Sequence, residues 1–356
     1  MAEPIQKNTD RIWVDGCFDF THHGHAGAML QARQLGKALV VGVHSDEDIA
    51  LNKGPVVMRL DERMKAVEAC RWVTEAVPNA PYVTDPAWMD KYGCYYAVHG
   101  DDITTDASGQ DAYRVVKNLH RFLLVKRTEG ISTTGLVQRL LDGSRDHYVQ
   151  NIDSIMSAVP WFERYASAAD GRSPLVQVDL NLSQTGFELR NLVKGDLPTY
   201  PNGCIYLDGS WDLFHTGQIE FLRRVGEIAQ QSQKGVIVGI FSDADCEPVM
   251  NLIERGLCVM QCRYVSRVIL NVPLYATDAM SAQIGANEVY HGARPVEPIN
   301  RYSRLSCPVN QIDHDYRDMS TETIIDRVRS NRLQYEERQK RKNAKAAVEA
   351  ALGQTA

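Results

Sequence analysis

The sequence predicts an α/β protein made of two tandem doubly wound domains, and three observations lead to this prediction. First, residues 11–25 (RIWVDGCFDFTHHGH) return as residues 204–218 (CIYLDGSWDLFHTGQ), and residues 40–46 (VVGVHSD) return as residues 237–243 (IVGIFSD). Second, short apolar runs alternate with helical patterns in each copy, which is typical of a parallel sheet covered by helices. Third, runs such as ALVVGVHS are apolar throughout, as expected for strands buried on both faces.

The elements of the first copy follow from these patterns in chain order. Apolar runs predict strands over residues 11–16, 38–45, 97–100 and 121–127. Helical patterns predict helices over residues 26–36 and 61–73, with a third helix opening at Ser132. No G-x-G-x-x-G follows the first strand, which excludes a dinucleotide-binding domain of the NAD type. A doubly wound sheet binds its ligand at the carboxyl ends of its strands.

The repeat sets the predicted domain boundaries. The two copies span residues 9–142 and 203–335. Residues 143–202 combine Gly, Ser, Asp and Pro with aromatic side chains and the run VQVDLNL, so we expect a partly ordered linker that packs on one or both domains. Residues 336–356 are rich in helix formers and charges, which predicts a charged helical tail exposed to solvent.

Composition excludes several classes of protein. Of 356 residues, 44% are hydrophobic and 24% are charged, which is ordinary for a globular protein with a core in each half. The net charge of −6 argues against a broad basic face for nucleic acid. No apolar run reaches the roughly 18 residues of a membrane span, and MAEPIQKNTD lacks the apolar segment of a signal peptide. Eight cysteines without a C-x-x-C pair indicate reduced thiols, so we expect a cytoplasmic protein.

Two histidines follow the first strand at a spacing suited to binding an anion. His22 and His25 are three residues apart, so both point from one side of the first turn of a helix that opens there. Gly24 lets the backbone approach a ligand closely, and a helix start offers unpaired N–H groups. Two imidazoles at this place could stabilise the charge on a phosphoryl group. A metal pair and surface histidines without a role are the alternatives, and a metal lacks a nearby Cys or Glu ligand.

Three further segments carry candidate ligands for the same site. Residues 127–134 (RTEGISTT) join an arginine, a glycine turn and hydroxyl groups at a helix start, which suits a phosphate, although a plain capped helix has the same pattern. Lys53 lies in a loop, LNKGPVV, after the second strand, and a solvated lysine is the alternative. Residues 99–102 (HGDD) end a predicted strand, where they either contact a ligand or form a turn held by Asp.

H-x-G-H after the first strand, with R-T-E-G-I-S-T-T downstream, resembles the cytidylyltransferase branch of the H-x-G-H nucleotidyltransferases. The resemblance covers both copies, about three quarters of the chain, and two such domains in one chain resemble the ethanolamine-phosphate cytidylyltransferases. It implies Rossmann-like domains that transfer CMP from CTP to phosphoethanolamine, giving CDP-ethanolamine and pyrophosphate in phosphatidylethanolamine synthesis. It also implies in-line attack at the α-phosphorus without a covalent intermediate, so catalysis would consist of positioning and charge stabilisation.

The resemblance further implies roles for residues of the first copy. His22 and His25 would hold the triphosphate and stabilise the transition state. Lys53 would neutralise phosphate charge, and Arg127 would grip the β- and γ-phosphates. The other positions implied to bind CTP are Cys17, Phe18, Gly24, His99, Gly100, Asp101, Asp102, Thr128, Gly130, Ile131, Ser132 and Thr133. Mg²⁺ is expected on the CTP phosphates, held by phosphate oxygens rather than by a protein cage.

The second copy departs from this pattern, so we expect it not to catalyse. Gln218 replaces the second histidine, and the loop that carries Lys53 in the first copy is five residues shorter and holds no lysine. Asp315 stands where the first copy has Arg127, and a carboxylate there would repel a triphosphate. We expect the second copy to take the place of a partner subunit in an intramolecular pseudo-dimer, with any further oligomer left open.

The choice of head group stays open at this stage. Phosphocholine or another phospho-alcohol could replace phosphoethanolamine, depending on how the site treats an ammonium group. The aromatic candidates for that contact are Trp72, Trp88, Tyr82 and Tyr92. A nucleotide-binding scaffold without activity is the alternative from another class, although a scaffold has no need of both histidines together with Lys53 and Arg127. Use of the family's product suggests loose association with the endoplasmic reticulum.

Overall fold

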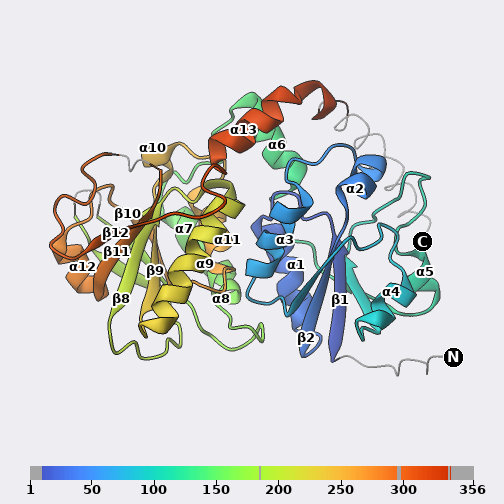
Figure 1. Cartoon of the computed structure of the whole chain (residues 1–356), viewed down its shortest axis with the longest axis horizontal. Coiled ribbons are helices and arrows are strands. Elements are labelled where there is room, and N and C mark those ends of the chain that lie inside the picture. Colours follow the sequence, from blue (N-terminus) through green and yellow to red (C-terminus); the bar gives the residue numbers. More distant parts are fainter. Residues whose placement is uncertain (1–9, 184–185, 295–297, 336, 338–356) are drawn as a thin grey trace. The chain divides into compact units, whose positions relative to one another are not determined.

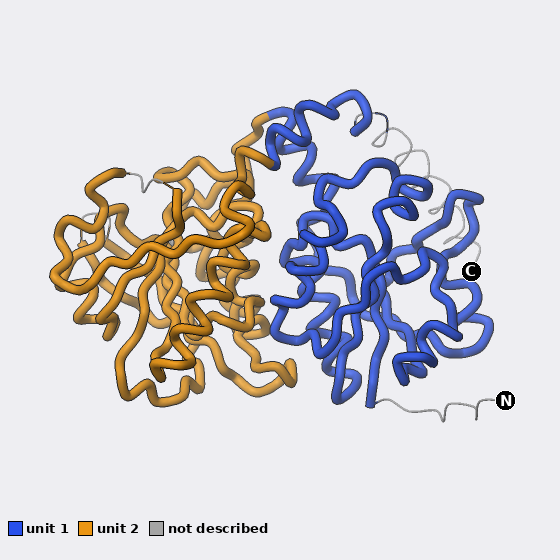
Figure 2. The backbone as a smooth tube through the Cα atoms, viewed as in Figure 1, with its two compact units in different colours: residues 1–142, 324–356 blue, residues 143–323 orange. Residues whose placement is uncertain are grey.

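The computed structural model describes residues 10–183, 186–294, 298–335 and 337 (Figure 1). The chain divides into two compact units: the first contains residues 1–142 and 324–356, and the second contains residues 143–323 (Figure 2). Each unit carries the sheet of one repeat. Of the predicted helical tail, residues 336–356, all but Glu337 lie outside the described residues.

The first unit is built on a five-stranded sheet in the order β3-β2-β1-β4-β5. Neighbouring strands are parallel throughout. The strands are β1 (Arg11–Gly16), β2 (Ala38–Val43), β3 (Glu75–Pro78), β4 (Tyr96–Gly100) and β5 (Phe122–Val125). The chain moves from β1 to one edge and then continues on the other side at β4, so the carboxyl ends of β1 and β4 flank the switch point where such sheets bind ligands. This confirms the predicted fold class.

Helices lie at the three places where the patterns predict them, but the details differ: the helix predicted over residues 26–36 runs from His23 to Arg33. The helices that connect or follow these strands are α1 (His23–Arg33), α2 (Asp46–Asn52), α3 (Leu60–Ala69), α4 (Pro86–Lys91), α5 (Arg114–Asn118) and α6 (Thr133–Asp142). The helix predicted to reach Val73 ends at Ala69, because Cys70 has an extended backbone with φ −67° and ψ 125°. The loop LNKGPVV, which was expected to carry Lys53, begins inside α2, and Lys53 is the C-terminal cap of that helix.

The second unit repeats this topology and enlarges it. Its sheet has the order β12-β11-β8-β9-β10-β6-β7, of which the first five strands reproduce the order of the first unit. Its strands are β6 (Gln177–Asn181), β7 (Leu189–Val193), β8 (Cys204–Gly209), β9 (Gly235–Phe241), β10 (Arg267–Val272), β11 (Ala286–Gly292) and β12 (Val309–Ile312). Its helices are α7 (Ile152–Ser157), α8 (Val159–Tyr165), the 3₁₀ turn η1 (Asp212–Phe214), α9 (Thr216–Gln231), α10 (Asp243–Cys246), α11 (Leu252–Met260) and α12 (Asp278–Ile284).

The segment expected to be a linker, residues 143–202, forms part of the second unit instead. Its strand β6 pairs in parallel with β10, and β7 pairs antiparallel with β6. Asp179 on β6 accepts a hydrogen bond from Arg267 Nε on β10 at 2.7 Å. Phe162 and Tyr165 on α8 are fully buried. Strands β6 and β7 extend the sheet beyond β10, which the mixed composition of the segment did not reveal.

Helix α13 (Thr321–Ser330) contains residues of both units. Residues 321–323 count with the second unit, and residues 324–330 count with the first. The first unit therefore includes the C-terminal part of the second repeat, although the repeat pattern predicted a second domain that ends at residue 335. In the same way, the residues that follow α6 of the first repeat belong to the second unit. The two repeats have exchanged their C-terminal segments.

Candidate active site of the first unit

A strained backbone leads from β1 into α1. Phe18 and Phe20 are buried and have φ angles of 52° and 48°, in the left-handed region that residues other than glycine rarely adopt. The second unit repeats both features, with Trp211 at φ 55° and Leu213 at φ 56°. Such residues cost about 1–3 kcal/mol each and persist only where the surroundings hold them in place. The segment that precedes the histidines is thus held by its packing.

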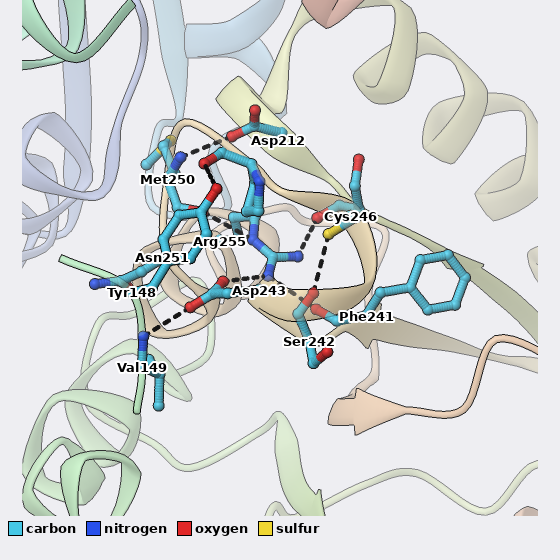
Figure 3. A network of polar contacts seen from close by, with 12 residues as sticks. Tyr148, Val149, Asp212, Phe241, Ser242, Asp243, Cys246, Met250, Asn251 and Arg255 are labelled. Atoms are coloured by element: carbon cyan, nitrogen blue, oxygen red, sulfur yellow. Dashed lines mark hydrogen bonds and ion pairs between the residues drawn. The ribbon is translucent and has the colours of Figure 1, made fainter. Parts of the chain in front are cut away.

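Arg63 is the buried side chain that holds the ends of β1 and β2 together. Its acceptors are the carbonyl oxygens of Cys17, His44 and Met58 and the carboxylate of Asp46, at 2.6–3.1 Å. Figure 3 shows the equivalent side chain of the second unit, Arg255, which pairs with Asp243 at 2.7 Å. The sequence patterns considered above do not indicate this role. An arginine repeated at the same place in two copies, on a helix packed against the sheet, is the signal that could have shown it.

His22 and His25 lie face to face at the start of α1. Their rings are stacked, with centroids 3.9 Å apart and an angle of 17° between the planes. Nδ1 of His22 accepts a hydrogen bond from the Gly24 N–H at 3.1 Å, which caps the helix. A neutral His22 ring therefore carries its proton on Nε2, and this N–H is the donor that it can offer to an anion.

The charges of Lys53 and Arg127 act on His25. His25 is half-buried, and burial lowers its pKa to about 3, with the positive charge of Lys53 as a further cause and that of Arg127 as a smaller one. The Asp102 carboxylate opposes this shift. A neutral His25 therefore lies within the field of both cations. The structure thus brings together His22, His25, Lys53 and Arg127, which were predicted to act as one group.

The start of α1 packs closely against the RTEGISTT segment. A Cβ on Gly24 would come within 2.7 Å of the Ile131 side chain and 2.8 Å of His22 Nδ1, so a side chain has no room there. Sequence analysis assigned Gly24 to the close approach of a ligand, whereas the nearest neighbours in the structure are these two side chains. Gly130 has φ 83°, so the expected glycine turn is present.

Hydroxyl groups of the same segment have partners within the fold. Ser132 Oγ accepts the Gly135 N–H at 3.0 Å and so caps α6, and Thr133 donates to the Asp19 carbonyl oxygen at 2.9 Å. Thr128 is buried. The alternative of a capped helix is therefore confirmed for Ser132, and the contact of these residues with a phosphate stays a prediction.

The end of β4 contributes the residues of the HGDD motif. The His99 ring lies 4.6 Å from that of Tyr113, and burial lowers the pKa of His99. Asp101 accepts the backbone N–H of Arg127 at 3.0 Å, and Asp102 lies 3.8 Å from the Arg127 guanidinium. The motif therefore fixes where Arg127 lies, and its contact with cytidine stays a prediction.

Asp15, which sequence analysis used only to align the repeats, is the buried carboxylate at the end of β1. It accepts three hydrogen bonds, each of 2.8 Å, from Trp13 Nε1, Thr84 Oγ1 and Tyr113 Oη. These donors are neutral, so among the described residues the carboxylate has no cationic partner. The signal that could have found it is an acidic residue at the carboxyl end of the first strand of a parallel sheet.

Tyr82 is the aromatic candidate that lies beside the predicted catalytic residues. Its ring centre is 5.1 Å from that of His44 and 5.8 Å from Lys53 Nζ. Trp72 is fully buried, and Trp88 and Tyr92 pack against the hydrophobic core, to which Tyr82 also belongs. The structure therefore favours Tyr82 among the four for contact with a cationic head group.

The second unit provides its own cation at the corresponding place. Arg301 stands where the first unit has Ala112, and it donates to Asp208, the counterpart of Asp15, at 2.8 Å. The guanidinium also lies 4.6 Å from the ring centre of Phe241. The carboxylate that has no cationic partner among the described residues of the first unit is paired with a guanidinium in the second.

The helix start of the second unit is also altered. Gln218 accepts the His215 backbone N–H at 3.2 Å and completes a capping box. Burial lowers the pKa of His215 to about 3, with Arg294 as a further cause. A side chain that closes the helix end thus replaces the second histidine.

Two alternatives, a metal site and a membrane span, remain to be compared with the structure. Across the described ranges, no group of three or more His, Cys, Asp and Glu side chains is arranged to hold a metal ion, so the metal pair proposed for His22 and His25 lacks further ligands there. The helices that the structure describes include none long and apolar enough to cross a bilayer.

Known proteins match both repeats. The cytidylyltransferase-like family matches residues 13–139 and 206–340. A probable ethanolamine-phosphate cytidylyltransferase of Schizosaccharomyces pombe is 40% identical over 95% of each chain. The ethanolamine-phosphate cytidylyltransferase of Dictyostelium discoideum is 38% identical over 97% of this chain and 98% of its own. Choline-phosphate cytidylyltransferase A of Mus musculus is 39% identical, over 37% of this chain and 36% of its own. Similarity along nearly the whole chain is thus to proteins named for ethanolamine phosphate.

Proposed function

Since the chain belongs to the ethanolamine-phosphate cytidylyltransferase family, we propose that its first unit transfers CMP from CTP to phosphoethanolamine, releasing pyrophosphate. A phosphate oxygen of phosphoethanolamine attacks the α-phosphorus of CTP, that bond forms as the bond to pyrophosphate breaks, and CDP-ethanolamine results. The observation that carries the proposal is the gathering of His22, His25, Lys53 and Arg127 at the switch point of the first sheet.

The reaction needs positive charge and hydrogen-bond donors around a triphosphate, and these side chains supply both. The Nε2–H of His22 and the neutral ring of His25 would donate to phosphate oxygens at the start of α1, where the positive end of the helix dipole also favours an anion. Lys53 would offset the charge that two phosphate groups bring to the α-phosphorus. Arg127, fixed by Asp101, would bind the leaving pyrophosphate.

The ammonium end of the substrate would bind at Asp15. This buried carboxylate accepts hydrogen bonds from neutral donors and has no cationic partner among the described residues, so it can pair with a cation of the substrate. The rings of Tyr82 and Tyr113 at the same end of the sheet would supply aromatic contacts to that cation. A primary ammonium has three N–H donors for a carboxylate, whereas a quaternary head group has none, so this arrangement favours phosphoethanolamine over phosphocholine.

Mg²⁺ would enter with CTP. The described residues include no cluster of three or more metal-binding side chains, and the predicted phosphate-binding residues are basic rather than acidic. This donor set fits a cation that the triphosphate oxygens hold, and it does not fit a protein cage. The Mg²⁺ would supply further charge neutralisation on the phosphates. The cytoplasmic location and the association with the endoplasmic reticulum stay predictions.

Pyrophosphate release tests this proposal directly. The purified chain is given CTP and Mg²⁺ with either phosphoethanolamine or phosphocholine, and we expect release with phosphoethanolamine. His25→Gln, which copies the residue of the second unit, should lower kcat about 10²- to 10³-fold, the range for removal of a transition-state donor. His215→Ala is the matched control in the second unit and should leave kcat within about twofold, since the reaction is assigned to the first unit. Preference for phosphocholine would contradict the proposed substrate. An equal loss of kcat in His25→Gln and His215→Ala would contradict the assignment of the reaction to the first unit.

A further inference from the structure

We propose that the C-terminal segment of the second repeat, residues 324–335, positions the Lys53 loop of the first unit through Arg327 and Tyr335. We call residues 53–58 the Lys53 loop. The inference rests on the proposed function, because it assumes that Lys53 contacts the reacting phosphates. Arg327 and Tyr335 are positioning residues, which act through the loop and do not touch the substrate.

Arg327 forms a two-armed ion pair at the end of the Lys53 loop. Its Nη1 and Nη2 donate to the two carboxylate oxygens of Glu62 at 2.7 and 2.8 Å, and Nη1 also lies 3.3 Å from the Val57 carbonyl oxygen. The Glu62 side chain is completely buried, and it accepts the Arg59 backbone N–H at 2.8 Å at the start of α3. A buried carboxylate paired in this way fixes both the helix start and the loop that leads into it.

Tyr335 contacts Val56, the loop residue just before Val57. Tyr335 is 3% exposed, and its hydroxyl donates to the Val56 carbonyl oxygen at 3.0 Å. From the other side, Asp19 accepts the backbone N–H groups of Val57 and Met58 at 2.8–3.3 Å. The loop is therefore held on two sides. Asp19, in the segment before H-x-G-H, binds one side, and the segment that binds the other side lies about 270 residues further along the chain than the loop.

Lys53 lies at the other end of this short loop. Its backbone N–H closes α2 by donating to the Ile49 carbonyl oxygen at 2.7 Å. Gly54 follows with φ 99°, in the left-handed region, so the chain turns directly after Lys53. With α2 on one side and the anchored Val56 and Val57 on the other, few residues remain that could let Lys53 move relative to the histidines.

The second unit contains the reciprocal contact. Tyr148, which follows the last helix of the first repeat, donates to the Pro248 carbonyl oxygen at 2.8 Å, and His147 Nε2 bonds to the Val249 carbonyl oxygen at 2.8 Å. Pro248 and Val249 precede Met250 and so correspond to Val56 and Val57 before Met58. Figure 3 shows Tyr148 and Val149 beside the loop of the second unit.

The contact in the second unit shows which part of this arrangement is purely structural and which part bears on activity. The same tyrosine-to-carbonyl bond is made in both units, so it belongs to the exchanged architecture. In the second unit the loop holds no lysine, and the contact only secures a shortened connection. In the first unit it secures the loop that carries Lys53. The second repeat thereby contributes to catalysis without a site of its own.

Substitutions in the full-length chain test the proposal. Arg327→Lys keeps the charge beside Glu62 and loses the two-armed geometry, and Tyr335→Phe removes one hydrogen bond without changing charge. We expect kcat to fall at least fivefold in each, with the KM for CTP changed by less than twofold. Arg329→Ala, an exposed arginine on the same helix, is the matched control and should match the parent chain.

Coupling to Lys53 distinguishes positioning from simple stability. In a Lys53→Ala background, Arg327→Lys should cause less than a twofold further loss of kcat, because its effect passes through the missing ammonium. The same loss in both backgrounds would overturn the proposal, and so would an unchanged kcat in both single variants. If Lys53→Ala alone leaves kcat unchanged, the role of Lys53 in the proposed function fails. A different result, in which Lys53→Ala lowers kcat and Arg327→Lys does not, would leave the role of Lys53 intact and contradict only the positioning by Arg327.

Discussion

Arg301 donates to Asp208 at 2.8 Å in the second unit, whereas the equivalent carboxylate of the first unit, Asp15, is bonded by neutral donors. The cation of the second unit comes from one substitution between the repeats, Ala112 in the first and Arg301 in the second. A guanidinium at the end of β8 satisfies the carboxylate from within. The carboxylate at the end of β1 can pair with an ammonium ion, and this asymmetry supports the proposal that the head group binds in the first unit.

Asp15→Asn should weaken binding of phosphoethanolamine. The amide keeps the size of the side chain and loses its charge, so the KM for phosphoethanolamine should rise about 10- to 100-fold, as expected for roughly 1.5–3 kcal/mol per hydrogen bond to a charged group. The KM for CTP should change by less than about threefold, since the two substrates occupy different parts of the site. Steady-state kinetics with each substrate varied in turn measures both values. Ethyl phosphate, which lacks the ammonium, serves as the control substrate. An equal loss with ethyl phosphate would contradict the assignment of Asp15.

Arg301→Ala should destabilise the second unit. It leaves the buried side chain of Asp208 without this cation, and burial already raises the pKa of that carboxyl. Loss of one partner from a buried ion pair costs about 3–5 kcal/mol. Chemical denaturation followed by tryptophan fluorescence should show this loss, and Arg304→Ala, at an exposed arginine nearby, should change stability by less than about 0.5 kcal/mol. Equal stabilities of the two variants would contradict the ion pair.

Much of the fold could be predicted because its signals are local. The strands are continuous apolar runs, and each run occurs once in each repeat. The prediction of β1 is therefore strengthened by the similar run at β8, and that of β2 by the run at β9. The histidines at the start of α1 could be found in the same way, since their spacing along the helix is a property of a few adjacent residues.

The remaining features depend on contacts between distant segments. Arg327 and Glu62 are 265 residues apart, and no periodicity connects them. The exchange of C-terminal segments cannot be recognised from the composition of those segments. Strand β6 pairs with β10, which lies about 90 residues later in the chain, so local patterns do not reveal the pairing either. Asp15 becomes a candidate for substrate binding only once its three donors, from three separate segments, are known to be neutral.

Gly24→Ala should slow the reaction by disturbing the contact between the two motifs. A Cβ would meet Ile131 at 2.7 Å and His22 at 2.8 Å, so one of these side chains must shift. Overpacking of this kind costs about 1–3 kcal/mol, and we expect kcat to fall at least tenfold as the histidine moves. Gly135→Ala is the control, because its nearest neighbour would be Ser132 Oγ at 3.3 Å, and it should keep kcat within about twofold. Adding Ile131→Ala to Gly24→Ala removes one of the two clashes and should restore part of the activity. An unchanged kcat in Gly24→Ala would show that the close packing has no bearing on His22.

CTP binding should be coupled to protonation of His25. In the free protein, burial, followed by the charge of Lys53, holds the pKa of His25 at about 3, so the ring is neutral at pH 5.5. A bound triphosphate places negative charge beside the ring and raises its pKa, so binding takes up a proton at acidic pH, and the uptake disappears by about pH 8, above the usual pKa of histidine. The same depressed pKa means that His25 disfavours the folded state as the pH falls below about 6.5, because the unfolded chain then binds more protons.

Calorimetry of CTP binding in two buffers with different ionisation enthalpies measures this uptake at pH 5.5 and pH 8. CTP has its own titrating phosphate, so the quantity of interest is the difference between the parent chain and His25→Gln, in which that contribution cancels. We expect the parent to take up more protons than the variant at pH 5.5 and an equal number at pH 8. If the parent and His25→Gln take up equal numbers of protons at pH 5.5 as well as at pH 8, the triphosphate does not change the charge of His25. The assignment of this ring to the phosphate-binding group would then be wrong.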